Sequence, residues 1–199
     1  MPRAPLSAPS DGTRRRVLRA LALALAMPLV PPLIRAARAD VIPIRAADLR
    51  VEDGELLLSA QFELALTPPL TEALTRGIPL YFTVEFELTR PRWYWLDEKV
   101  AQWSITYRVS YSELTRQYRV SSGPLGQAFE SLDEVQRFVG RVSSRPVAHA
   151  DALVKGARYE AALRMRLDVT QLPKPFQVSA LTSHEWQLAS DWDRWSFTP

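Results

Sequence analysis

The chain of 199 residues contains no cysteine, only two histidines and only seven glycines. Without cysteine it can form no disulfide, no thiolate metal site and no thiol nucleophile. His149 and His184 are far apart, and beyond Glu185 neither has a neighbour at a metal-ligand spacing. The glycines form neither a phosphate-binding loop nor a Gly-x-Ser-x-Gly nucleophile elbow. We therefore expect no enzyme activity, no catalytic residue, no metal and no cofactor.

The sequence also lacks an apolar run long enough to span a membrane. The apolar stretch at 20–27 is too short, and three prolines interrupt the segment after it. An arginine triplet, Arg14-Arg15-Arg16, precedes this stretch, and the small-x-small sequence Ala37-Arg38-Ala39 lies on its C-terminal side, which is typical of an export signal. We predict that residues 1–39 are cleaved, leaving a single periplasmic domain over 40–199. The alternative is a retained membrane anchor. The general secretory route is favoured over the twin-arginine route, whose pattern the triplet also resembles.

The positive net charge comes from the predicted signal. Residues 1–39 hold seven of the 25 basic residues and one of the 22 acidic residues, which leaves 18 basic and 21 acidic residues in the domain. A nucleic-acid-binding domain needs a basic surface after processing. We therefore do not expect a nucleic-acid partner.

Period-2 alternation of apolar and polar residues dominates the domain. From Leu56 onward, apolar residues alternate with polar ones over about a dozen positions, as in a half-buried strand. Such strands without a βαβ rhythm favour an antiparallel β-sandwich of immunoglobulin-like architecture, with seven or eight strands and two short helices. The predicted strands are 48–51, 55–66, 82–88, 100–111, 114–121, an edge strand near Val147, 159–169, 176–181 and 186–197 with a bulge at 191–193. The predicted helices are 68–76 and 131–141.

Four motifs resemble a known family. "RPRWYW" at 90–95, "LTRQYRV" at 114–120, "LPKPFQV" at 172–178 and "WSFTP" at 195–199 are similar to the uncharacterised proteobacterial family catalogued as domain of unknown function 4390. The resemblance covers most of residues 45–199. It implies an exported protein, often labelled a proline-rich signal peptide protein, without an assigned activity or site residues. It also implies a genomic neighbourhood that contains a sensor kinase, which suggests a membrane sensor protein or envelope component as partner.

Two clusters mix tryptophan with charge and are the candidate binding residues: Arg92, Trp93, Tyr94 and Trp95, and then Trp192, Arg194 and Trp195. One interpretation is structural, with indoles closing one end of the sandwich and Arg90, Arg92 or Arg194 stacked on them. The other is capture of a protein or ligand, because Trp, Tyr and Arg are enriched at interface hot spots. A third, a glycosidase using Asp97 with Glu98 or Asp191 with Asp193, is disfavoured, since adjacent acids at strand ends are usually solvated and Asp193 beside Arg194 suggests an ion pair.

The outward-facing charges also allow two interpretations. Glu85 and Glu87 could pair across the sheet with Arg164 and Arg166, or these four residues could form a docking face. Taken together, the sequence favours an exported, non-enzymatic protein-binding or accessory module. The alternative is a carbohydrate or cell-envelope ligand binder that uses exposed tryptophans as a platform.

Overall fold

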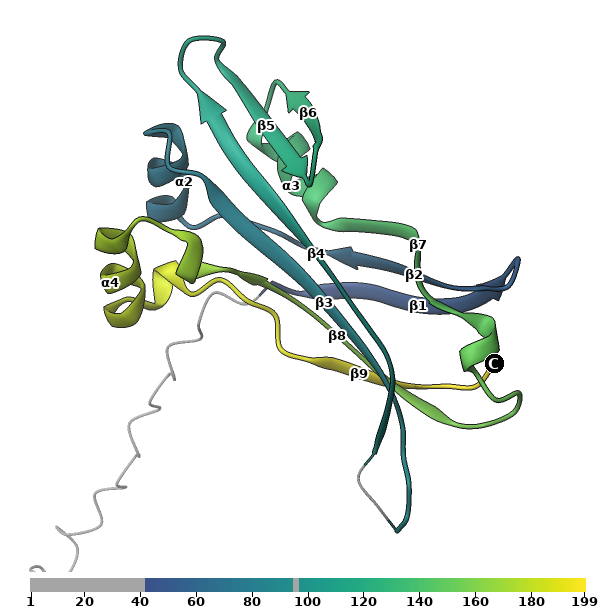
Figure 1. Ribbon diagram of the computed structural model, residues 1–199. Helices are drawn as coiled ribbons and strands as arrows, with labels where there is room; N and C mark the ends of the chain where they lie inside the picture. The colour runs from purple at the N-terminus through teal and green to yellow at the C-terminus, as the bar shows by residue number, and fades with distance from the viewer. Residues whose placement is uncertain (1–41, 95–96) are drawn as a thin grey trace, which may run out of the picture. The chain divides into compact units, whose positions relative to one another are not determined.

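The computed structural model describes residues 42–94 and 97–199 (Figure 1). The expected export signal at 1–39 lies outside the described residues. The described part is mainly β-structure in two antiparallel sheets, as predicted, and it contains nine strands where seven or eight were expected.

The larger sheet has six strands in the order β6-β5-β4-β3-β8-β9, with every neighbouring pair antiparallel. Its strands are β3 (Leu80–Arg90), β4 (Glu98–Ser112), β5 (Gln117–Ser122), β6 (Leu125–Phe129), β8 (Tyr159–Leu167) and β9 (Asp193–Phe197). β6 was not predicted, because its five residues are mostly exposed and carry no clear alternation.

The smaller sheet has three strands in the order β1-β2-β7, namely β1 (Ile44–Glu52), β2 (Glu55–Phe62) and β7 (Arg141–His149). The predicted turn at Asp53-Gly54 joins β1 to β2, and both residues have the positive φ that a tight hairpin turn requires. The prediction of a loop over 143–156 with an edge strand near Val147 is only partly right. β7 is a nine-residue edge strand, and a positive φ at Ser144 and a proline at 146 hide its alternation.

The apolar faces of the two sheets share one core. On β3 the residues Phe82, Val84 and Phe86 are fully buried, and so are Leu56 and Leu58 on β2. All five belong to a single cluster of packed apolar residues. This packing of alternate residues between two sheets is what a β-sandwich requires. The predicted fold class is therefore confirmed.

Within residues 42–94 and 97–199, three short α-helices, one more than expected, connect the strands: α2 (Pro68–Thr75), α3 (Leu132–Val139) and α4 (Lys174–Thr182). α2 and α3 lie where the sequence predicts them. The Ser131 hydroxyl caps α3 by accepting the Glu134 N–H at 3.3 Å.

The strand predicted at 176–181 is wrong, because these residues belong to α4. Pro173 and Pro175 flank the start of this helix, and the fixed φ of proline suits a first helical turn. The aromatic and β-branched residues of the segment resembled a strand, but Phe176 instead packs on Trp186 of a 3₁₀ turn, with ring centroids 5.3 Å apart.

The last predicted strand, 186–197, is also too long. Only β9 forms a regular strand, and a single bridge joins Ala189 to Arg166 before it. Between that bridge and the Leu163–Asp193 pair, the C-terminal segment has one residue more than β8. The predicted bulge near 191–193 is thus confirmed.

Candidate functional site

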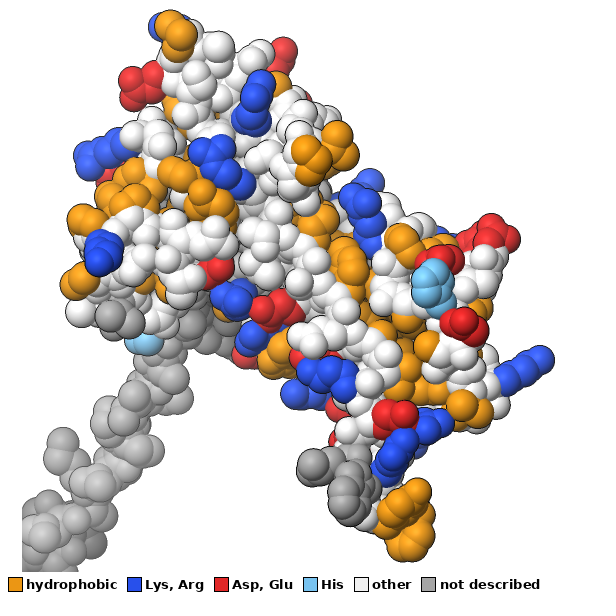
Figure 2. Space-filling model, viewed as in Figure 1, with side chains coloured by type: hydrophobic (Ala, Val, Ile, Leu, Met, Phe, Trp, Pro, Cys, Tyr) orange, Lys and Arg blue, Asp and Glu red, His pale blue; other side chains and the backbone are white. Residues whose placement is uncertain are grey.

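The β3–β4 hairpin continues beyond the strands beside it (Figure 1), and exposed hydrophobic side chains lie at its end (Figure 2). β3 last pairs with β8 at Thr89, whereas it still pairs with β4 at Arg90. Beyond this point Trp93 is 95% exposed and Tyr94 is 66% exposed. We call residues 91–94 and 97 the hairpin tip. It contains three of the candidate residues, while the fourth, Trp95, lies outside the described residues.

Ion pairs support the base of the hairpin tip. Glu98 Oε2 forms ion pairs with the guanidinium groups of Arg90, at 2.5 Å, and Arg92, at 2.6 Å. The hydrogen bond from Arg92 and the second from Arg90 hold the pKa of the Glu98 carboxyl below its ordinary value of 4.5, although desolvation acts in the opposite direction. A carboxylate kept ionised in this way is poorly suited to act as a general acid. The geometry therefore gives no support to the disfavoured glycosidase interpretation at Asp97 and Glu98.

The two aromatic rings at the tip do not form a flat surface. Trp93 and Tyr94 have ring centroids 5.0 Å apart and an interplanar angle of 72°. This edge-to-face arrangement is a favoured aromatic contact. It presents a convex knob of mixed polar and apolar character, with Arg92 at its base.

The C-terminal cluster is packed against the sheet. Trp195 is half-buried against the core, and the Arg164 guanidinium lies 4.4 Å from the Trp192 ring centroid. Arg194 pairs with Glu160 at 3.5 Å and not with Asp193 as expected. The expectation of arginine stacking is thus right in kind, but the arginine is Arg164. In this arrangement Trp192 and Trp195 are partly buried, whereas Arg194 is largely exposed.

Trp192 lies far along the sheet from the hairpin tip. Trp192 lies against Arg164, which is paired in register with Glu85 of β3. The hairpin tip begins after Arg90, five residues further along β3, which corresponds to about 17 Å at ~3.4 Å per residue. Trp192 is therefore distant from the hairpin tip, whereas Trp195 is in register with Ala161 and, through it, with Leu88, on the core-facing side of the sheet.

The outer face of the six-stranded sheet carries a paired charge network. Glu85 accepts hydrogen bonds from Arg164 and, at 3.0 and 3.2 Å, from Arg166. Desolvation acts to raise the pKa of the Glu85 carboxyl, but these arginine hydrogen bonds lower it below 4.5 overall. Glu87 pairs with Lys99 at 3.1 Å. The predicted cross-strand pairing is thus confirmed for Glu85, while Glu87 has a different partner.

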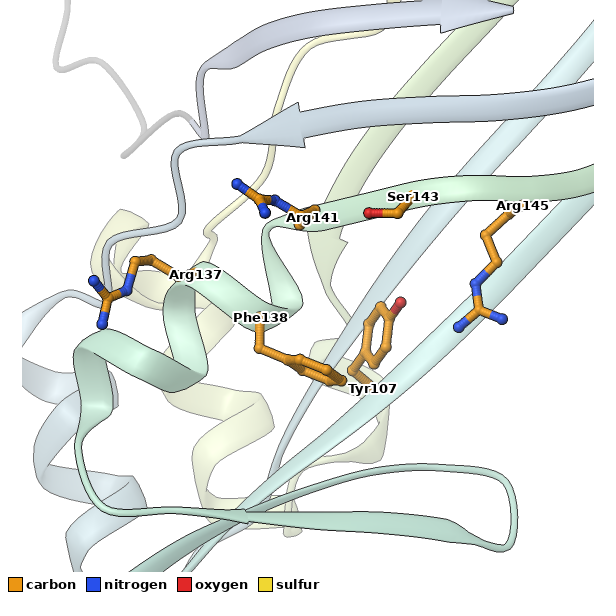
Figure 3. Close-up of a pocket in the computed structure, with 6 residues that line it drawn as sticks. All are labelled: Tyr107, Arg137, Phe138, Arg141, Ser143 and Arg145. Atoms are coloured by element: carbon orange, nitrogen blue, oxygen red, sulfur yellow. The ribbon is translucent and has the colours of Figure 1, made fainter. Parts of the chain in front are cut away.

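A cavity of about 490 Å³ lies at the edge of the smaller sheet, and sequence analysis did not find it. β4, α3 and β7 supply its lining (Figure 3). The lining residues are Tyr107, Arg137, Phe138, Arg141, Ser143 and Arg145. We call this the arginine cavity. The only charged residues in its lining are arginines, so its electrostatic potential is positive.

A register shift in β7 places Arg145 on the core-facing side of the strand, where it remains exposed. Ala60 pairs with Val142 and Leu58 pairs with Arg145, so β7 uses one residue more than β2 over this interval. Ser144, with φ of 45°, occupies the shift. Paired residues share a face, so Arg145 lies on the same face as the buried Leu58. Figure 3 shows Arg145 directed from β7 toward Tyr107, with Arg137 and Arg141 directed to the opposite side of Phe138.

Two aromatic rings form the floor of the arginine cavity. Tyr107 is 4% exposed, and its ring centroid lies 6.3 Å from that of Phe138. Burial raises the pKa of the Tyr107 hydroxyl above its ordinary value of 10.0, while the positive charge of Arg145 acts to lower it. The hydroxyl therefore stays protonated at neutral pH and can donate a hydrogen bond.

A second hollow, of about 320 Å³, adjoins the arginine cavity and shares Tyr107, Phe138 and Arg145 with it. Arg145 is the one charged residue in its lining. The remaining lining residues are mainly small or apolar: Ile105, Val120, Ser122, Leu125, Gly126 and Gln127. We call this the apolar hollow. The recurrence of arginine at 137, 141 and 145 was visible in the sequence, but it could not reveal that β4 and β5 complete the site.

Metal chemistry has no support in the described part of the chain. No group of three or more His, Asp or Glu side chains there could hold a metal ion. His149 lies 3.1 Å from Glu55 at the end of the β2–β7 pair, and its side chain is largely exposed. Over the same residues, no helix combines the length and hydropathy needed to cross a membrane.

These observations define a class of protein, a two-sheet antiparallel β-domain with a projecting aromatic tip and a basic surface cavity. The family described as Domain of unknown function (DUF4390) matches residues 39–196, and the chain belongs to this family. The resemblance carried by the four motifs is thereby confirmed. No curated protein and no solved structure is significantly similar to the chain.

Proposed function

We propose that this protein is an exported, non-enzymatic protein-binding module whose anchor is the hairpin tip. The observation that carries the proposal is the exposure of Trp93, at 95%, on a hairpin that projects from the domain. An exposed indole has no stabilising role in the fold, and its burial against a partner would release about 2 kcal/mol or more. The Glu98 ion pairs with Arg90 and Arg92 brace the tip and so lower the entropic cost of binding.

The shape of the tip favours a protein over a sugar. A sugar ring stacks best on a flat, open aromatic face, whereas Trp93 and Tyr94 meet at 72°. A convex knob with Arg92 beside it suits insertion into a pocket on another protein. The alternative partner is a carbohydrate of the cell envelope, and the experiment described below distinguishes it from a protein.

The proposal includes export to the periplasm and a partner in the cell envelope. The arginine triplet, the short apolar stretch and Ala37-Arg38-Ala39 support a periplasmic location. The partner we propose is an envelope protein, with a membrane sensor as the first candidate.

The test is site-specific photo-crosslinking in cells. A benzophenone side chain replaces Tyr94, and captured proteins are identified by mass spectrometry. The matched control places the same group at Leu114, which is also 95% exposed but lies beyond the opposite end of β4. We expect one envelope protein to be captured from position 94 and not from position 114.

The captured protein is then purified and its affinity measured. We expect Trp93→Ala to weaken binding at least about 30-fold, the effect of a hot-spot residue. Equal capture from both positions, or an affinity unchanged by Trp93→Ala, would contradict the proposal. Quenching of tryptophan fluorescence by envelope glycans, without protein capture, would favour the carbohydrate alternative.

A further inference from the structure

We propose that the arginine cavity and the apolar hollow together form a binding site for an anionic amphiphile, a small molecule with a phosphate or carboxylate head and an apolar tail. The site is independent of the hairpin tip, because it uses different residues at a different part of the domain. Both hollows fall in the size range of about 300–1,000 Å³ that is typical of small-molecule sites.

The charge of the site points to an anionic head. Among the described residues, Arg137, Arg141 and Arg145 make no ion pair with a carboxylate. Arg90 and Arg92 at the hairpin base and Arg164, Arg166 and Arg194 have acidic partners, whereas Arg108 and Arg119 of the outer face have none among the described residues. The three arginines here differ from Arg108 and Arg119 because all three line one cavity. Arg145, which is directed toward Tyr107, can contact an anion in the cavity, and Arg137 and Arg141, which also line it, add to the positive potential there. Guanidinium groups bind phosphate and carboxylate with matching geometry.

Arg145 is the central residue because it lines both hollows. The Ser143 and Tyr107 hydroxyls lie in the lining of the same cavity and can donate further hydrogen bonds to a head group. Arg137 also stabilises the last turn of α3 through the helix dipole, so its charge has a structural use. We therefore expect Arg145 to contribute most to binding, and Arg141 to contribute through longer-range attraction.

The apolar hollow would bind the apolar tail of the ligand. Ile105, Val120 and Leu125 face it from three neighbouring strands, and Phe138 closes it from α3. Phe138 is more exposed than Val135 and Val139 of the same helix, which are buried. It remains 39% exposed, although it contacts the rings of Tyr107 and Phe129. A tail lying here would cover both Phe138 and Leu125, which is 78% exposed.

Edge protection is the competing explanation for Arg145. β7 is an edge strand, and an inward-pointing charge, a bulge and a proline are common devices against edge-to-edge pairing. This explanation accounts for Arg145 and Ser144. It does not account for Arg141, nor for an apolar hollow that opens beside the charge. It also predicts no dependence of ligand affinity on tail length.

The experiment is isothermal titration of the purified protein with hexyl phosphate and decyl phosphate, each below its micelle concentration. Inorganic phosphate and decyltrimethylammonium are the control ligands. We expect affinity to rise about fourfold for each added methylene until the hollow is full, as burial of apolar surface requires. We expect little binding of either control ligand.

Variants then test the assigned residues. Arg145→Gln should weaken decyl phosphate binding about 10- to 100-fold, the loss of a charge-assisted hydrogen bond, and Arg141→Gln should weaken it less. Leu125→Asp should weaken decyl phosphate binding while leaving any binding of inorganic phosphate unchanged. The matched control is Arg119→Gln, an equal charge change at an exposed residue next to Val120, on the opposite face of β5.

Three outcomes would overturn the proposal. Equal affinity for hexyl and decyl phosphate would show that no tail is bound. Equal affinity for decyltrimethylammonium and decyl phosphate would show that the arginines do not select an anionic head group. An equal effect of Arg145→Gln and Arg119→Gln, with thermal melting unchanged in both, would show that general charge and not the cavity attracts the ligand.

Discussion

At the scale of single residues, arginine has three different environments in this domain. Arg164 pairs with Glu85 and covers Trp192, so one side chain contributes both a charge interaction and a contact with an aromatic face. Arg92 braces the hairpin tip through Glu98. Arg145 faces a cavity without an acidic partner among the described residues. The residue type is the same in all three cases. Only the residues that surround each arginine in the folded protein distinguish a structural arginine from one that is available for binding.

Glu85 gives a pH-dependent prediction at this scale. Its carboxyl pKa is lowered in the folded protein from an ordinary value of 4.5, so its stabilising effect is complete above about pH 4.5 and is lost as the pH falls below that value. We expect Glu85→Gln to lower the free energy of unfolding by about 1 kcal/mol at pH 7, because partly exposed charged hydrogen bonds are screened by solvent.

Urea unfolding of the wild type and of Glu85→Gln at pH 7 and at pH 3 is the measurement. The difference between the two proteins should shrink at pH 3, which lies below the ordinary carboxyl value of 4.5, because Glu85 is then largely protonated in the unfolded chain. Glu87→Gln is the control, because its Lys99 partner is half exposed and the pair should contribute little. A difference that is the same at both pH values would show that the charge of Glu85 is not the cause.

At the scale of elements, the sequence predicts strands well where both alternation and burial persist. β8 alternates strictly between buried and less buried residues, β3 departs from this alternation at the buried Thr83, and both strands were found. β7 was largely missed because Ser144 adds a residue and reverses the alternation. α4 was mistaken for a strand because its aromatic and β-branched residues favour strands locally. In the folded domain, tertiary packing and the prolines at its start stabilise a helix instead.

Gly140 gives a prediction at this scale. It ends α3, and its carbonyl accepts the Phe62 N–H of β2 at 2.7 Å. A Cβ atom here would lie 2.6 Å from the Phe62 carbonyl oxygen and 2.9 Å from that of Gln136. Both contacts involve backbone, which cannot move away cheaply. We therefore expect Gly140→Ala to lower the free energy of unfolding by about 1–3 kcal/mol.

The matched control is Gly126→Ala on β6, where a Cβ atom would make only ordinary contacts at 3.8–3.9 Å. This change should be neutral or slightly stabilising, because alanine restricts the unfolded chain. Urea unfolding of both variants is the measurement. Equal effects of the two substitutions would show that the close approach of α3 to β2 does not constrain residue 140.

At the scale of the whole molecule, the two proposed binding features lie at different distances along one strand. β4 begins at Glu98 beside the hairpin tip and reaches the arginine cavity at Tyr107, nine residues further on, which is about 30 Å at ~3.4 Å per residue. The tip could be predicted from sequence because its aromatic residues are consecutive. The cavity could not, because its lining comes from three segments that only the sandwich brings together.

This separation predicts that the two sites act independently. Substitutions more than about 10 Å apart without shared partners usually have additive effects to within about 0.5 kcal/mol. We expect Trp93→Ala to leave decyl phosphate affinity unchanged and Arg145→Gln to leave capture by the partner protein unchanged. The double variant should then show both losses, each equal to that of the single variant. If saturation with decyl phosphate changes partner affinity in the wild type but not in Arg145→Gln, the two sites are coupled, and the domain would report ligand occupancy to its partner through β4.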